Sequence, residues 1–185
     1  MLTEFTGDTI AYFEVHGTGK AVGDATELEV LSHVHPDTVN KAVIGLIKAN
    51  IGHTKAAGIA GLIKVTMAVH RQILPLVTGC ERHQAQLTED KARLQVLKEG
   101  QIWPNSLPLR TGVSAMGFGG INSHIILERL SQIRRHTLTQ QEQKLIHSPQ
   151  DAELFLLSAN RQEDLQAQVN RLLNIVPLLG NFAKI

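Results

Sequence analysis

The chain has 185 residues, of which 43% are hydrophobic and 19% are charged, and its mean hydropathy is −0.03. These values are typical of a globular chain that is long enough to bury a core. There are 18 Lys and Arg residues against 17 Asp and Glu residues, so the formal net charge is only +1. A nearly neutral chain with 4% aromatic residues lacks the basic field and the stacking platforms of a general nucleic-acid binder.

The single cysteine and the N-terminal sequence bear on the cellular compartment. Cys80 is the one cysteine, so it forms neither an internal disulfide nor a thiolate metal cage. The start, MLTEFTGDTI, has no basic or apolar signal region, and no apolar run reaches the roughly 18 to 20 residues of a membrane span. We therefore expect a cytoplasmic protein with no membrane or nucleic-acid partner.

The expected elements alternate between strands and helices along the chain. Strands are predicted over residues 9–16, which are β-branched and aromatic, and over 43–48, which are almost entirely apolar. Residues 54–74 predict a buried helix because small or aliphatic side chains occupy nearly every side of it. A helical pattern follows at 90–100, and a strand, a glycine turn and a strand follow at 111–127. This alternation predicts a layered α/β domain.

The composition changes in the last third of the chain. Residues 131–152 are polar and rich in glutamine, which is typical of a linker. The segment ELFLLSAN then predicts a short strand, and Asn160 with Glu163 predicts the capping box of a helix that Pro177 ends. The chain is therefore predicted to have three parts: a domain at 1–130, a polar linker at 131–152 and the start of a second unit at 153–185.

Three polar loops bordered by glycines follow predicted strands, where α/β proteins gather their ligand chemistry. They are HGTGKAVGD (16–24), KANIGH (48–53) and GFGGIN (117–122). The first is not a phosphate loop, because its glycine spacing is too short and Ala21 follows the Gly-Lys pair. The nine histidines lack metal-ligand spacing, so no metal site is predicted and a zinc-dependent module is only an alternative. His16 and His53 stand out because both lie beside glycines at strand ends.

Three long motifs in this order carry a resemblance to a known family. YFEVHGTGKAVGDATELEVL, VIGLIKANIGHTKAAGIAGLIK and GVSAMGFGGINSHIILE resemble the C-terminal half of the β-ketoacyl synthase (ketosynthase) domain of type I polyketide and fatty-acid synthases. The resemblance covers about residues 9–128, and ELFLLSANRQEDLQAQVNRLL resembles the start of the linker after such domains. AVGDATELEVL and SAMGFGGIN are similar to iterative synthases of the enediyne or polyene type. The resemblance implies a thiolase-like layered α/β/α fold.

The resemblance also implies an acyltransferase, which joins a malonyl-type extender unit to an acyl thioester by decarboxylative Claisen condensation. His16 and His53 match the two histidines that donate hydrogen bonds to the forming enolate. Lys48 matches the lysine that holds the second histidine in place. A buried ammonium needs a partner, and Asp24 or Glu27 is expected to supply a carboxylate.

The glycine turn matches the oxyanion hole of the family. Phe118 matches the residue whose backbone N–H enters that hole and whose ring gates the substrate channel, with Gly119 beside it and Asn122 in support. Met116 stands where the family commonly has Phe, so a looser gate is expected. The nucleophilic cysteine belongs to the other half of the domain, and Cys80 does not match its motif. We therefore expect no nucleophile in this chain and no activity from the chain alone.

The resemblance also implies partners, and the sequence departs from the family in places. Substrates would arrive on the phosphopantetheine arm of an acyl carrier protein, the chain itself would bind no cofactor, and the intact enzyme would be a homodimer completed by the N-terminal ketosynthase half. Lys20 stands where the family usually has Thr. One residue fewer lies between His53 and Gly58, which rotates the following helix by about 100°. The alternative function is a non-catalytic remnant or interaction module that keeps the fold without turnover.

Overall fold

The structure is a computed structural model. The residues that it describes are 6–35, 40–78, 87, 92–117, 119–130, 133–146 and 157–182. The chain divides into two compact units, the first formed by 1–78 with 83–147 and the second by 79–82 with 148–185. Within the described ranges, no helix is long and apolar enough to cross a membrane.

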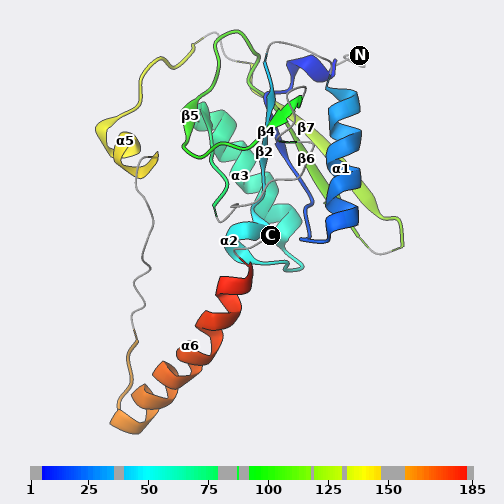
Figure 1. Cartoon of the computed structure of the whole chain (residues 1–185). Coiled ribbons are helices and arrows are strands. Elements are labelled where there is room, and N and C mark those ends of the chain that lie inside the picture. Colours follow the sequence, from blue (N-terminus) through cyan, green and yellow to red (C-terminus); the bar gives the residue numbers. More distant parts are fainter. Residues whose placement is uncertain are drawn as a thin grey trace. The chain divides into compact units, whose positions relative to one another are not determined.

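The first unit is built on a five-stranded sheet in the order β4-β2-β1-β6-β7 (Figure 1). Its strands are β1 (Tyr12–Glu14), β2 (Ala42–Gly45), β4 (Leu94–Gln95), β6 (Arg110–Met116) and β7 (Asn122–Glu128). β1 pairs in parallel with β2 and with β6, and β4 pairs in parallel with β2. β7 returns antiparallel to β6. The carboxyl ends of β1, β2 and β6 therefore meet at one end of the sheet.

Helices cover both faces of this sheet (Figure 1), namely α1 (Ala21–Val34) and α3 (Ala57–Arg71). Successive side chains of a strand point to opposite faces. Tyr12 accordingly packs in the core cluster that includes Val65 of α3, whereas Phe13 packs in the cluster that includes Leu28 of α1. The unit is thus a layered α/β structure with a core on each side of the sheet, as the alternation of elements predicted.

The helix α3 is only partly the buried helix that the sequence predicted. It ends at Arg71, because Gln72 takes a left-handed conformation with φ 56°. One face of α3 is buried around Val65. The opposite face carries an apolar stripe of three residues spaced by four, which are 56%, 55% and 58% exposed: Ile59, Ile63 and Met67.

Other elements differ from the prediction in type or extent. The strand predicted over 9–16 is β1 alone, preceded by the 3-10 turn η1 (Gly7–Thr9), and the strand predicted over 43–48 ends at Gly45 before the short helix α2 (Lys48–Ile51). The helix predicted over 90–100 is wrong, since Leu94 and Gln95 form β4 on the edge of the sheet. A short apolar pattern does not distinguish a buried strand from a helix. β3 (Ile73–Leu74) and β5 (Gln101–Ile102) form a separate antiparallel pair.

Residues 133–146, which the sequence placed in a polar linker, are attached to the first unit and include the helix α5 (Gln140–Ile146). The Gln72 side-chain amide donates to the Ile133 carbonyl at 3.0 Å, and its oxygen accepts from the Arg135 N–H at 2.8 Å. The Arg135 guanidinium also pairs with Glu142 of α5. Polar composition is typical of linkers, but it does not reveal that these polar groups have partners in the folded unit.

The second unit contains α6 (Gln162–Phe182). The prediction that Pro177 ends this helix is wrong, because the helix continues to Phe182. A proline removes one backbone donor, and the remaining hydrogen bonds of this 21-residue helix continue on both sides. The strand predicted from ELFLLSAN falls largely outside the described residues, and Leu157 to Ala159 are not in a strand.

Gly45→Ala is expected to destabilise the first unit by about 1–3 kcal/mol, the usual cost of overpacking. An added Cβ at Gly45 would lie 1.6 Å from the Tyr12 hydroxyl oxygen. Gly23→Ala in α1 is the matched control, because its added Cβ meets nothing within 4 Å and Ala is favoured over Gly in helices by about 0.5–1 kcal/mol. Urea unfolding should move the two midpoints in opposite directions. An unchanged midpoint for Gly45→Ala would contradict the packing described.

Candidate functional site

The predicted site residues gather at the carboxyl ends of the parallel strands. His16 lies two residues after β1, Lys48 is the first residue of α2 after β2, and Met116 is the last residue of β6. β1 lies between β2 and β6 in the sheet, so His16 lies between the other two. His53 comes from the turn before α3, and its ring lies edge-on to that of His16, with 5.7 Å between centroids. These four residues form the candidate site.

The loop that carries His16 is held by two carboxylates of α1. The N–H groups of His16 and Gly17 donate to Glu27 at 2.8 and 3.0 Å. The N–H groups of Thr18 and Gly19 each donate to Asp24 at 2.9 Å. Gly17 and Gly19 have positive φ angles of 33° and 76°, which glycine adopts without a steric cost. Burial raises the pKa of Glu27, and its backbone hydrogen bonds lower it.

The ring of His16 is oriented by a backbone donor. The Met116 N–H donates to His16 Nδ1 at 3.2 Å. A neutral imidazole has one donor and one acceptor nitrogen, so with Nδ1 accepting, the ring proton lies on Nε2. His16 therefore presents an N–H donor on the side of the ring away from β6.

Lys48 contacts His16 rather than the partners that the sequence indicated. Its ammonium donates to the His16 carbonyl and lies 3.5 Å from His16 Nδ1. The resemblance implied that Lys48 holds His53, and we expected Asp24 or Glu27 to pair with the ammonium. Both carboxylates instead accept backbone N–H groups. Burial lowers the pKa of Lys48, and the charge of Glu27 opposes this at a distance.

The electrostatics of the site favour a neutral His16. Burial lowers the pKa of His16 from its ordinary value of 6.5, electrostatic interactions with Lys48 and with the neighbouring His53 lower it further, and Asp24 opposes them. The unfolded chain therefore takes up the proton first as the pH falls. Neutral His16 contributes to the stability of the fold above pH 6.5, and this contribution is lost as the pH falls below that value.

Two further predicted residues, Gly119 and Asn122, follow Met116 at the β6–β7 connection. Met116 faces Asn122 across the β6–β7 pair, and the Gly117 N–H donates to the Ile121 carbonyl at 2.8 Å. Gly119 has a positive φ of 80°, which the tight turn requires. Phe118 lies outside the described residues, as does Cys80. In the ranges that the structure describes, no group of three His, Cys, Asp or Glu side chains could hold a metal ion.

Sequence analysis missed a buried carboxylate beneath the site. Glu14 of β1 is 1% exposed. It accepts a hydrogen bond from the Tyr12 hydroxyl at 2.8 Å and one from the Ile47 N–H at 2.5 Å, and it pairs with Lys64 of α3 at 2.9 Å. The available signal was one acidic residue within an apolar strand and one lysine within an apolar helix, which together indicate a buried pair.

Comparison with known proteins identifies the family. The chain matches the C-terminal domain of β-ketoacyl synthase over residues 2–81 and the C-terminal extension of ketoacyl synthetases over residues 86–178. A highly reducing polyketide synthase of Penicillium roqueforti is 36% identical over 167 residues, which cover 88% of this chain and 8% of the relative. A phenolphthiocerol/phthiocerol polyketide synthase of Mycobacterium tuberculosis is 38% identical over 131 residues, which cover 69% of this chain and 6% of the relative.

Solved ketosynthase structures share the fold. Ketosynthase twelve of the bacillaene polyketide synthase of Bacillus amyloliquefaciens matches with a TM-score of 0.62 and 27% identity over 94% of this chain and 29% of its own. The module 6 ketosynthase of the bacillaene synthase of Bacillus subtilis matches with a TM-score of 0.61 and 31% identity over 93% and 28%. The fold is thus the thiolase-like fold of ketosynthases. The chain belongs to the β-ketoacyl synthase family, as a C-terminal domain with its extension.

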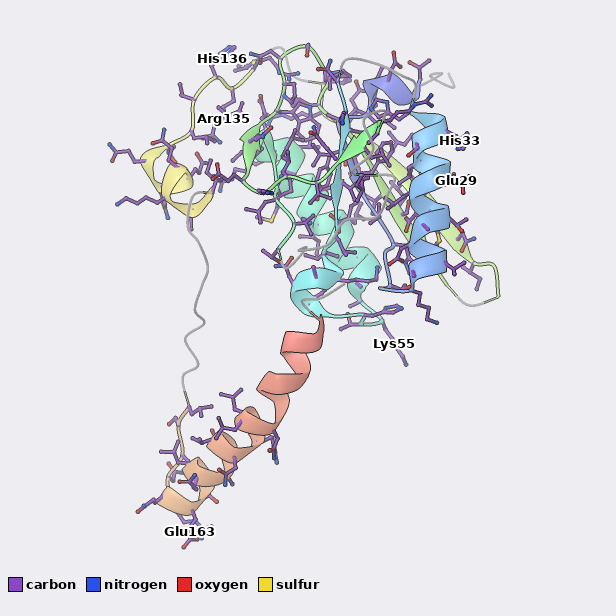
Figure 2. The ribbon with its side chains drawn as sticks, viewed as in Figure 1. Glu29, His33, Lys55, Arg135, His136 and Glu163 are labelled. Carbon is purple, nitrogen blue, oxygen red and sulfur yellow. The ribbon has the colours of Figure 1, made fainter. Side chains whose placement is uncertain are left out.

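Lys48→Met is expected to raise the pKa of His16 toward 6.5, because the variant removes the positive charge beside His16 Nδ1. NMR titration of the His16 ring in the 185-residue chain measures this. Lys55→Met is the matched control, since Lys55 is exposed on the turn before α3 and points away from the unit (Figure 2). If the two variants gave the same His16 pKa, the placement of Lys48 against His16 would be wrong.

Proposed function

We propose that this chain forms the C-terminal part of the active site of a condensing enzyme, an acyltransferase that makes polyketide or fatty acyl chains. In this reaction a malonyl-type thioester loses CO2, and the electrons of the broken C–C bond pass to the thioester oxygen as an enolate. The enolate carbon then attacks an acyl group on a cysteine of the N-terminal half, forms the new C–C bond and releases the cysteine thiolate.

His16 and His53 are proposed to donate hydrogen bonds to the enolate oxygen. The observation that carries this assignment is the 3.2 Å hydrogen bond from the Met116 N–H to His16 Nδ1, because it leaves Nε2–H as the free donor. The ring of His53 lies 5.7 Å from that of His16, so one thioester oxygen can lie near both. Fixed neutral donors stabilise charge that develops only in the transition state, and removing one typically costs about 10²–10³ in rate.

Lys48 is proposed to position His16. Asp24 and Glu27 are proposed to fix the loop of residues 16–19, which begins with His16. The glycine turn after Met116 is proposed to supply the oxyanion hole through the N–H of Phe118, with Gly119 and Asn122 shaping the turn. The positive φ angles of Gly119 and Gly120, 80° and 83°, support a backbone that can approach a ligand closely. Met116, which is 41% exposed, is proposed to line the acyl channel.

The partners follow from the same assignment. Substrates are proposed to arrive on the phosphopantetheine arm of an acyl carrier protein, so the chain needs no resident cofactor. The first unit is proposed to be completed by the N-terminal ketosynthase half, in a homodimeric enzyme. The apolar stripe of α3 supports this, because such a stripe is normally covered by another protein surface. The solved ketosynthases that match are more than three times as long as the matched segment, which covers 29% and 28% of them.

His16→Ala and His53→Ala are each expected to lower condensation by about 10²–10³-fold when the chain is combined with a ketosynthase N-terminal half that carries the cysteine. Acylation of that cysteine should persist, because it needs the thiol and the oxyanion hole rather than the enolate donors. Product formation and intact-mass spectrometry measure the two steps. Cys80→Ser is the control and should change neither.

Two outcomes would contradict the proposed function. If the unsubstituted chain gave no condensation although the complex formed and the cysteine was acylated, the non-catalytic interaction module would be favoured. If the chain alone became acylated on Cys80, the nucleophile would lie in this chain and the assignment to a separate half would be wrong.

Ile63→Glu on the apolar stripe is expected to weaken association with the N-terminal half at least tenfold, since it would bury an unpaired charge. Val30→Glu on α1 is the control, because Val30 and Ile63 are both 55% exposed and lie on opposite sides of the sheet. Both variants should fold as the parent chain does. Titration calorimetry measures the affinity of each variant for the N-terminal half. Equal affinities for the two variants would exclude the stripe as the contact surface.

A further inference from the structure

We propose that Glu14 is a positioning residue: its carboxylate holds Ile47, the residue directly before α2, so that the Lys48 ammonium stays against His16. Tyr12 and Lys64 fix the Glu14 carboxylate for this role. The inference deepens the proposed function and rests on it for the meaning of Lys48 and His16 in the reaction. Its structural content concerns this chain alone.

The first step of the argument is the burial of the carboxylate. The Glu14 side chain is 2% exposed, and a buried carboxylate is unfavourable unless its oxygens have partners. Oε2 accepts the Tyr12 hydroxyl at 2.8 Å and lies 2.9 Å from the Lys64 ammonium. Oε1 accepts the Ile47 N–H at 2.5 Å. Both oxygens are therefore used, and one of them is dedicated to a backbone group of another segment.

The second step is where these partners lie in the chain. Glu14 is two residues before His16, and Ile47 is directly before Lys48. Lys64 lies on α3, the helix that follows His53. The Glu14 carboxylate thus lies on the strand that leads to His16, accepts from the residue before Lys48, and pairs with the helix that follows His53.

The third step is that neighbouring residues leave room for this arrangement. A Cβ at Gly45 would meet the Tyr12 hydroxyl at 1.6 Å and Glu14 Oε2 at 2.7 Å. A Cβ at Gly61 would lie 3.1 Å from Glu14 Cγ. Apolar residues of similar volume are often at least as stabilising as a buried ion pair, so stability alone does not require Glu14 and Lys64. A specific acceptor for the Ile47 N–H does require Glu14.

The fourth step gives a measurable consequence. The groups that act on the charge of His16 are Lys48, His53 and Asp24, and Lys48 lowers the pKa of His16. If the Ile47 N–H loses its acceptor, Ile47 and the start of α2 shift. The Lys48 ammonium then leaves His16, and the pKa of His16 rises. Loss of the negative charge of Glu14 would by itself act in the opposite direction, so the sign separates the two effects.

The experiment compares two double variants of the 185-residue chain. Glu14→Met with Lys64→Met removes both charges and the acceptor of the Ile47 N–H. Glu14→Gln with Lys64→Met removes the same charges but keeps an acceptor oxygen. NMR titration should show the pKa of His16 rising toward 6.5 in the first variant and staying near the parent value in the second. Equal values in the two variants would overturn the proposal.

Two further comparisons sharpen the test. Glu29→Met with Lys55→Met removes the same charges from exposed positions (Figure 2) and should leave the pKa of His16 unchanged. In a Lys48→Met background, the Glu14→Met and Lys64→Met pair should add nothing to the pKa change, because the ammonium that it displaces is already gone. An additive change would show that Glu14 acts by another route and would overturn the proposal.

Two further measurements apply if the variant does not fold or if the proposed function fails. If Glu14→Met with Lys64→Met does not fold, hydrogen exchange of the Ile47 amide in the parent chain decides. Strong protection supports the hydrogen bond from the Ile47 N–H to Glu14, and exchange at the rate of an exposed loop overturns the proposal. All of these measurements are made without substrate. If they succeed while the complemented chain gives no condensation, only the proposed reaction fails.

Discussion

Four successive backbone N–H groups, those of residues 16–19, donate to two carboxylates on the first turns of α1. A loop that leaves the end of a strand has no neighbouring strand to accept these groups, and unpaired buried donors cost free energy comparable to a lost hydrogen bond. Glu27 and Asp24 accept these N–H groups, which removes the cost and restricts the loop to one backbone conformation. The position of His16, and with it the geometry of the candidate site, depends on this interaction.

The ionisable groups of the site share one unfavourable effect, which is the loss of hydration on burial. Burial lowers the pKa of Lys48 and of His16 and raises the pKa of Glu27, so it disfavours the charged form of each. The carboxylates oppose this for the ammonium, while the ammonium reinforces it for the imidazole. The Lys48 ammonium therefore lies beside a neutral His16 ring, with the carboxylates further away. Neutral His16 can therefore donate a hydrogen bond through Nε2–H without taking up a second ring proton.

Sequence reasoning found the parts of the site that follow from strand ends and glycine loops. The three glycine-bordered loops were predicted as ligand-binding segments because each follows a predicted strand. The roles of Lys48 and Met116 came from the family resemblance. The contact of Lys48 with His16 was not among the predictions, because a motif does not specify which of several carboxylates or ring nitrogens an ammonium reaches. Leu94 was assigned to a helix for a similar reason. Its core partners lie about fifty residues away in the sequence, on β2, and a local pattern cannot contain them.

The helix α3 connects the site to the surface that the first unit leaves exposed. Val65 faces the sheet core, Lys64 reaches the Glu14 carboxylate, and Ile63 belongs to the exposed stripe. Three consecutive residues thus point in three directions, as helical geometry requires. The exposed stripe, the core contact and the ion pair with Glu14 are therefore all built on one helix.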